Sequence, residues 1–180
     1  MKRKIIGIGV FLMSVVIFSG CDDEILTTDF TVTLSQDFVV TEVNDSVYVK
    51  DTLVDAADQS GDIEKYKDQI EKVTVEKVTY LLTSFTGDNT FELQNGVISL
   101  SDITGVNTKN IVQLSNVNLM NLLNNETQLP ADTSAVSLLA TLVKNAPHQF
   151  KLHADGELNK TAFDFTLRLK IYLTIKAKVM

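Results

Sequence analysis

The last part of the chain alternates between apolar and polar residues almost without error. From Phe163 to Val179 the odd-numbered positions are apolar, and the even-numbered positions are polar, charged or tyrosine. A period of two with one polar face is typical of an antiparallel strand that is buried on one side. The run is longer than most strands, so we expect it to bend or to take part in two sheets in succession.

Three further segments have the period of a strand. Residues 30–40 alternate except at Gln36 and Val39, and residues 150–155 alternate throughout. Val73 and Val75 share a phase that shifts by one residue before Val78. A shift of this kind near residues 76–77 predicts a β-bulge.

One dipeptide carries a strong turn signal. Asn95-Gly96 stands between residues 90–94 and 97–101, and both residues tolerate the positive φ angles of a two-residue hairpin turn. The sequence therefore predicts a hairpin centred on this dipeptide.

Two segments have helical spacing instead. Residues 63–73 repeat apolar side chains every three or four positions. They follow Ser60-Gly61-Asp62, which offers capping side chains, and we expect Asp62 to act as a helix cap. Residues 136–143 do the same and stop before Pro147. Residues 116–126, which are rich in asparagine, predict a loop with short helical turns.

These elements predict a mostly β protein. So many half-buried strands close most naturally as an antiparallel β-sandwich with one or two short helices. We expect residues 29–180 to form this single domain, because no repeat and no low-complexity linker divides them.

The N-terminus has the pattern of a signal peptide. Three cations at positions 2–4 precede an apolar run from Ile5 to Phe18, which is shorter than the roughly 20 residues of a spanning helix. The following Phe18-Ser19-Gly20-Cys21 resembles the lipobox of bacterial lipoproteins. The resemblance implies cleavage after residue 20, acylation of Cys21, and a linker over residues 21–28. Such acyl chains would anchor the protein in a membrane without spanning it.

The residues after the cysteine are acidic. Asp22, Asp23 and Glu24 resemble the export signal of surface-exposed Bacteroidota lipoproteins. The same position also resembles an enterobacterial inner-membrane retention signal, and a plain acidic linker remains a third interpretation. We favour the outer membrane and the cell surface, with the periplasmic face as the alternative.

Charge narrows the range of partners. Without the three cations at positions 2–4, the 16 basic residues become 13 against 23 acidic ones, a formal charge of −10. Nucleic acid is therefore not an expected partner, because phosphate binding needs clustered cations. The cations Arg168, Lys170, Lys176 and Lys178 do cluster, and we interpret them as a solvated face that protects a sheet edge; the alternative is a contact with anionic glycans or lipid headgroups.

The chain contains no recognisable catalytic or metal motif. We expect its two histidines, His148 and His153, to be solvated and too far apart for a metal pair. The acidic stretch from Asp51 to Glu64 lacks the spacing of a calcium loop. We therefore expect no metal, no cofactor and no catalytic residue.

Three functions follow as hypotheses. The first is a lipid-anchored, non-enzymatic binding or structural module with an envelope protein or a glycan as partner. The second is a fimbria-like subunit that donates the strand of residues 163–179 to a neighbour. The third is a small envelope hydrolase that uses carboxylates of the acidic stretch.

Overall fold

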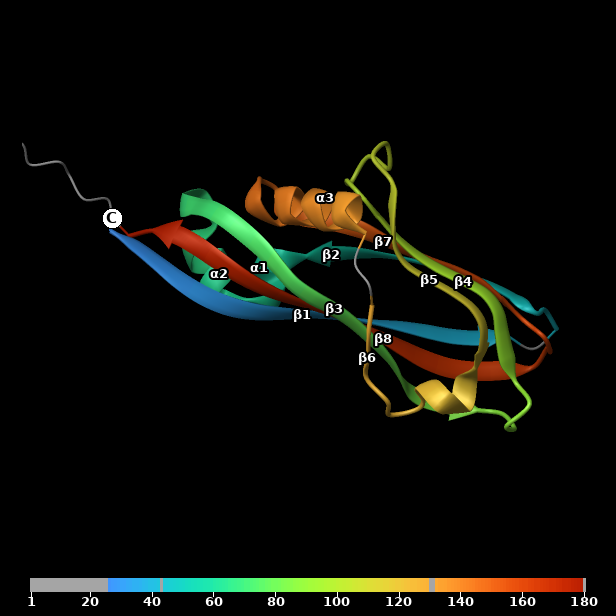
Figure 1. Ribbon diagram of the computed structural model, residues 1–180. Coiled ribbons are helices and arrows are strands. Elements are labelled where there is room, and N and C mark those ends of the chain that lie inside the picture. The colour runs from blue at the N-terminus through green and yellow to red at the C-terminus, as the bar shows by residue number, and fades with distance from the viewer. Residues whose placement is uncertain (1–25, 43, 130–131, 180) are drawn as a thin grey trace, which may run out of the picture.

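The protein is a sandwich of two four-stranded antiparallel sheets in a computed structural model that describes residues 26–42, 44–129 and 132–179 (Figure 1). Sheet A has the strand order β1 (Thr27–Glu42), β8 (Phe163–Lys178), β3 (Ile70–Thr86), β6 (Thr127–Gln128). Sheet B has the order β2 (Val47–Asp55), β7 (Gln149–Leu158), β4 (Glu92–Ser101), β5 (Lys109–Asn118). The predicted fold class is confirmed.

The long alternating run forms the central strand of sheet A. β8 pairs with β1 along its whole length and with β3 from Asp164 to Ala177, and its odd-numbered side chains are buried. It therefore serves one sheet, not two in succession. The predicted role as a donated strand is wrong, because β8 has no open edge, and for the same reason its cations do not protect a sheet edge.

The core lies between the inner faces of the two sheets. Among its fully buried side chains are Phe150 of sheet B and Phe165 of sheet A. The ring of Tyr48, from β2, meets that of Phe165 edge-on at 5.3 Å between centroids. Burial of one such aromatic side chain contributes roughly 1.5–3 kcal/mol, so replacement of Phe165 by alanine would cost about 3–5 kcal/mol.

The predicted bulge in β3 is confirmed, but the predicted helix over residues 63–73 is mostly wrong. The register of β3 against β8 shifts between Val75 and Lys77, at the predicted bulge. Helix α2 (Gly61–Tyr66) is followed by the 3-10 turn η1 (Lys67–Gln69), and Ile70 already belongs to β3. A further register shift between Ile70 and Lys72 lets Ile70 and Val73 both be buried although they are three residues apart. This bulge gives the strand a three-residue spacing of buried apolar residues, which in the sequence looks like a helix.

The cap of α2 is one of the two residues predicted to offer it. Ser60 Oγ, not Asp62, accepts a hydrogen bond from Ile63 N at 3.3 Å, and Asp62 lies in the first turn of α2. The preceding short helix α1 (Ala56–Gln59) is capped by Asp55, whose Oδ1 accepts from the backbone N–H groups of residues 57 and 58.

The hairpin predicted at Asn95-Gly96 is wrong. Both residues lie inside β4, and neither has a positive φ angle. A register shift between Leu93 and Asn95 marks a bulge there, and Gly96 stands opposite Gly156 of β7. The reversal instead comes after β4, where Gly105 has φ 80°. Pairing with β5 and β7 on both sides overrides the local turn preference.

Helix α3 (Thr133–Lys144) confirms the second predicted helix. Asp132 caps it by accepting from Ser134 N at 2.7 Å, and Leu139 and Val143 are buried against the sheets. Residues 116–126 contain the predicted helical turn, η2 (Leu119–Leu122), but their first three residues belong to β5. No helix of the described residues has the length and apolarity needed to cross a membrane.

Both ends of the described chain lie at one end of the sandwich. Thr27 pairs with Lys178, and Val179 N donates to the carbonyl of Leu26 at 2.7 Å. Because β1 begins at Thr27, two residues of the predicted linker belong to the fold. The linker between Cys21 and the first strand is therefore shorter than predicted.

Candidate functional site

The residues predicted to anchor and export the protein lie outside the described part of the structure. These are Cys21, Asp22, Asp23 and Glu24. Their roles stay predictions, and the chemistry of the described residues has to be considered on its own.

The acidic stretch does not converge on one pair of carboxylates. Asp51 projects from the outer face of β2, whereas Asp55 is occupied as the cap of α1 and accepts from Gln149 Nε2 at 2.6 Å. Glu64 pairs with Lys67 at 2.8 Å. Within the described residues, no group of three or more His, Cys, Asp or Glu is arranged to hold a metal ion.

The carboxyl groups whose pKa is shifted are all shifted downward. The Gln149 hydrogen bond lowers the pKa of Asp55, and Arg168 lowers that of Asp37. The same direction holds for Asp88, Asp102, Glu126 and Asp132. A general acid at neutral pH needs a raised pKa. None of these six groups provides it.

Glu126 is the best-connected carboxylate on the outer face of sheet A. It accepts hydrogen bonds from Lys170 Nζ at 2.6 Å and from the hydroxyls of Thr79 and Tyr172, both at 2.8 Å. The hydrogen bond from Lys170 is the main reason that its pKa falls to about 2. Its acceptors are occupied, so Glu126 ties the segment before β6 to β3 and β8 rather than forming a reactive group.

The two histidines have different environments. His148 is buried, and its Nδ1–H donates to the carbonyl of Val143 at 2.8 Å, so the predicted solvation of this residue is wrong. This hydrogen bond satisfies a backbone carbonyl in the last turn of α3. His153 is half-exposed on β7, with Nδ1 2.7 Å from Asp51 Oδ1 and Nε2 3.4 Å from Asp155 Oδ1.

A serine, a histidine and an aspartate share one row on the outer face of sheet B. Ser99 of β4 and Asp51 of β2 are both direct register partners of His153. Nucleophilic catalysis also needs N–H donors for the developing oxyanion. β4 is paired on both sides, so its N–H groups take part in ladders, and Asp155 occupies the side of Nε2. Ser99 is itself buried, whereas His153 is half-exposed and Asp51 is exposed, so the row meets solvent only at its β7 and β2 positions.

The interior holds little free space. A cavity of about 20 Å³ lies between the sheets and is lined by apolar side chains and Gly96, among them Leu82, Ile98 and Leu122. This volume is about that of one water molecule. It is too small for an organic ligand, and larger hollows of the described residues lie at the surface.

The open edge of β2 is the feature that stands out on that surface. Leu158 N donates to Ser46 O at 2.8 Å, and Ala56 N donates to His148 O at 3.0 Å. The register between β2 and β7 is continuous between these two bonds. The even-numbered residues of β2 therefore face β7, and the odd-numbered residues direct their N–H and C=O groups to the open side.

Three of these odd-numbered residues carry exposed apolar side chains. Val47, Val49 and Leu53 are 46%, 53% and 54% exposed. Asp45 Oδ1 accepts from Val47 N at 3.0 Å, whereas no hydrogen bond from the described residues reaches the edge-side groups of Val49, Asp51 or Leu53. An edge with free backbone groups and apolar side chains is a template for another strand.

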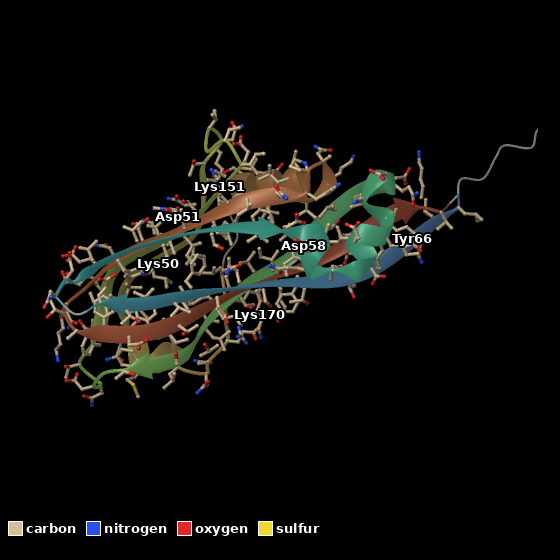
Figure 2. All side chains as sticks on the ribbon, turned by 180° about the vertical axis from the view of Figure 1, so that it is seen from behind. Lys50, Asp51, Asp58, Tyr66, Lys151 and Lys170 are labelled. Carbon is tan, nitrogen blue, oxygen red and sulfur yellow. The ribbon has the colours of Figure 1, made fainter. Side chains whose placement is uncertain are left out.

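The neighbouring edge, that of β1, is better protected. Gln59 Oε1 of α1 accepts from Ser35 N at 3.0 Å, and Gln36 Nε2 donates to Asp37 O at 2.9 Å. The views from both sides show β1 and β2 along the same side of the sandwich, with α1 and α2 at one end of β2 (Figures 1 and 2). Side chains thus cover the middle of β1 but leave β2 open.

Opposite charges mark the middle of the open edge. Asp51 lies on the outer face, and Lys50 lies half-buried on the inner side of the same strand. Figure 2 labels both residues on β2, with Lys151 of β7 beside them. The sequence of β2 alone gives no sign of this arrangement, because the order of strands in the sheet decides which edge stays open.

Comparison with known proteins gives limited information. No protein-family model matches the chain, and no curated protein matches it. Among solved structures, it is similar to a chain of desmodium yellow mottle tymovirus, with 6% identity, a TM-score of 0.38 and coverage of 100% of this chain and 97% of that one. It is similar to a chain of tobacco necrosis virus, with 10% identity, a TM-score of 0.36 and coverage of 85% and 98%.

Proposed function

We propose that the protein is a lipid-anchored lipoprotein of the outer membrane, displayed at the cell surface, and that it acts as a non-enzymatic binding module. The observation that carries the binding role is the open edge of β2. The partner is an extended segment of another envelope protein, which adds a strand to sheet B. In this mode the main-chain hydrogen bonds supply affinity and the side chains supply specificity.

The charges on β2 define the chemistry of this segment. A partner strand sets one residue opposite Lys50 and the adjacent residue opposite Asp51. Cross-strand pairs of opposite charge are favourable, and the like-charge pairs are unfavourable. The segment therefore carries an acidic residue next to a basic one, with apolar residues that meet Val49 and Leu53.

A second copy of the chain does not fit this edge equally well. In antiparallel pairing, directly opposed residues either both direct their backbone groups at the partner strand or both direct them away. Lys50 and Asp51 face opposite edges, so Lys50 cannot oppose Asp51 of another copy. A symmetric pair of β2 strands centred on Lys50 would place Lys50 opposite Lys50 of the second copy, and one centred on Asp51 would place Asp51 opposite Asp51. Either like-charge pair costs stability.

Photo-cross-linking in cells tests the proposal. A photo-reactive residue at Val49 is expected to capture an envelope protein through an extended segment with adjacent acidic and basic residues. The matched control is Val39 on β1, which is also an exposed valine of an edge strand, 61% exposed. Equal capture at Val39 and Val49, or capture at neither, would contradict strand addition on β2.

A proline substitution then separates strand addition from ordinary side-chain contact. Val49→Pro removes an N–H that faces the open side and leaves the ladder with β7 intact. It is expected to abolish cross-linking from Leu53 without a change in thermal unfolding, whereas Val49→Thr retains cross-linking. Persistence of the adduct in V49P would overturn the proposed hydrogen-bonded edge.

A further inference from the structure

Two lysines face each other on the outer face of sheet A. Lys176 of β8 is the direct register partner of Lys72 of β3, and both side chains are exposed. Asp29 stands opposite Lys176 on β1. Within the described residues, no carboxylate oxygen lies within 4 Å of either lysine nitrogen, and the two lysines line one small surface hollow with Asp29, Thr74 and Thr174.

This pair departs from the charge arrangement of the other cations of β8. Arg168, Lys170 and Lys178 each bind a carboxylate of sheet A or its adjoining segment, at 2.6, 2.6 and 3.3 Å. Like charges directly opposite each other on neighbouring strands destabilise a sheet. Asp29 faces Lys176 from β1 without forming an ion pair, so it offsets this repulsion only in part. A local rule that is broken with incomplete compensation inside the fold points to a function.

The pair also lies near the point where the chain enters the fold. The β1–β8 ladder ends with Thr27 opposite Lys178, only two residues beyond Lys176. Five residues, 22–26, separate this end from Cys21. Fully extended, five residues reach about 18 Å. An acylated Cys21 would therefore keep this end of sheet A within reach of lipid headgroups.

We propose that Lys72 and Lys176 bind the phosphate groups of anionic lipids in the membrane that holds the anchor. The contact turns this end of sheet A toward the bilayer and leaves the β2 edge accessible. It rests on the proposed lipid anchor. Because the chain as a whole is acidic, an anionic membrane surface repels most of it. The two lysines therefore favour the orientation in which their end of sheet A faces the membrane.

Energy transfer on vesicles tests the orientation. The lipidated protein carries a fluorophore on a cysteine introduced at Thr31, in the row next to Lys176, and the vesicles carry an acceptor lipid. Transfer is expected to be higher on vesicles with phosphatidylglycerol than on phosphatidylcholine alone. This increase should be lost in the Lys72→Thr/Lys176→Thr variant, and in 0.5 M salt, where the screening length is only about 4 Å.

A matched variant controls for net charge. Lys109→Thr/Lys151→Thr removes two exposed lysines from sheet B and is expected to keep the increase in transfer. Equal transfer in the wild type and in the Lys72/Lys176 variant would overturn the proposal, as would equal loss in both variants. Failure of the protein to incorporate into vesicles would instead contradict the lipid anchor, so the two failures are distinguishable.

A stability measurement gives an independent readout. If the two lysines repel each other in the free protein, Lys72→Thr is expected to raise the melting temperature by about 1–3 °C. An unchanged or lower melting temperature would contradict the like-charge cost on which the inference depends.

Discussion

Arg168 of β8 holds Asp37 of β1 in a two-point hydrogen bond across the main ladder of sheet A. Nε donates to Oδ1 at 2.6 Å and Nη2 donates to Oδ2 at 2.7 Å, and the two residues are direct register partners. Planar groups that match in this way fix the register as well as contribute energy. The pair lies on the solvent-facing side of sheet A, so screening by water limits its contribution to the stability of the fold.

We expect the coupling between these residues to be small but measurable. A double-mutant cycle with Asp37→Asn and Arg168→Gln should give a coupling free energy of about 0.5–1 kcal/mol at low salt, measured by urea unfolding. Salt should reduce it, because exposed charges are screened. Strict additivity of the two substitutions would show that the ion pair contributes nothing.

Glu126 should make stability depend on pH. Its pKa in the folded state is about 2, below the ordinary 4.5, so the stabilisation is complete above pH 4.5 and is lost as the pH falls toward 2. Since the side chain is 32% exposed, we expect Glu126→Gln to cost about 1 kcal/mol at pH 7. Urea unfolding at pH 7, 4 and 3 should show the difference from wild type shrinking with acidity; a difference independent of pH would contradict this role.

Gly156 leaves room for the ring of Tyr48. A Cβ at this position would lie 2.6 Å from the Tyr48 hydroxyl oxygen and 2.7 Å from two ring carbons, and the ring is buried against Phe165. Gly156→Ala is therefore expected to destabilise the fold by about 1–3 kcal/mol in thermal unfolding. Gly61→Ala is the control, because nothing lies within 4 Å of a Cβ at that position. Equal effects of both substitutions would refute the steric explanation.

The lipid anchor predicts how the protein fractionates. Cys21→Ala should move the protein from the membrane fraction to the soluble fraction, because the acyl chains supply the membrane affinity. Retention in the membrane fraction would contradict acylation of Cys21.

The acidic signal predicts surface display. Protease added to intact cells should degrade the wild type, whereas replacement of Asp22, Asp23 and Glu24 by alanine should protect the protein. Protection of both forms would place the sandwich in the periplasm and leave the anchor unaffected.

Sequence alternation predicted the parts of the fold in which one face is buried along a whole strand. β8 is the clearest case, since burial and period agree over its whole length. The prediction failed where two local signals conflicted. Asn95-Gly96 has turn chemistry, but β4 continues through it because it pairs with a neighbour on each side. The bulge near Ile70 gives a strand the spacing of a helix.

The candidate site was less accessible to sequence reasoning. Val49 and Leu53 look like ordinary strand residues, and only the order of strands shows that their backbone groups face an open edge. The opposition of Lys72 and Lys176 likewise depends on register between segments about 100 residues apart. Glu126 sat in a segment without a clear period, so its three hydrogen bonds could not be foreseen.

The shared location of Leu26 and Val179 matters for anyone who attaches a reporter to this protein. A fusion placed after β8 leaves the fold beside the proposed anchor and would be crowded by the bilayer. At the other end of β8 lies the turn before Phe163, where Ala162 has φ 60°. Sixteen residues of strand at about 3.3 Å each separate the two positions by about 50 Å. An epitope inserted in that distal turn would be presented to the medium, whereas one at the C-terminal side would be hidden beneath the protein.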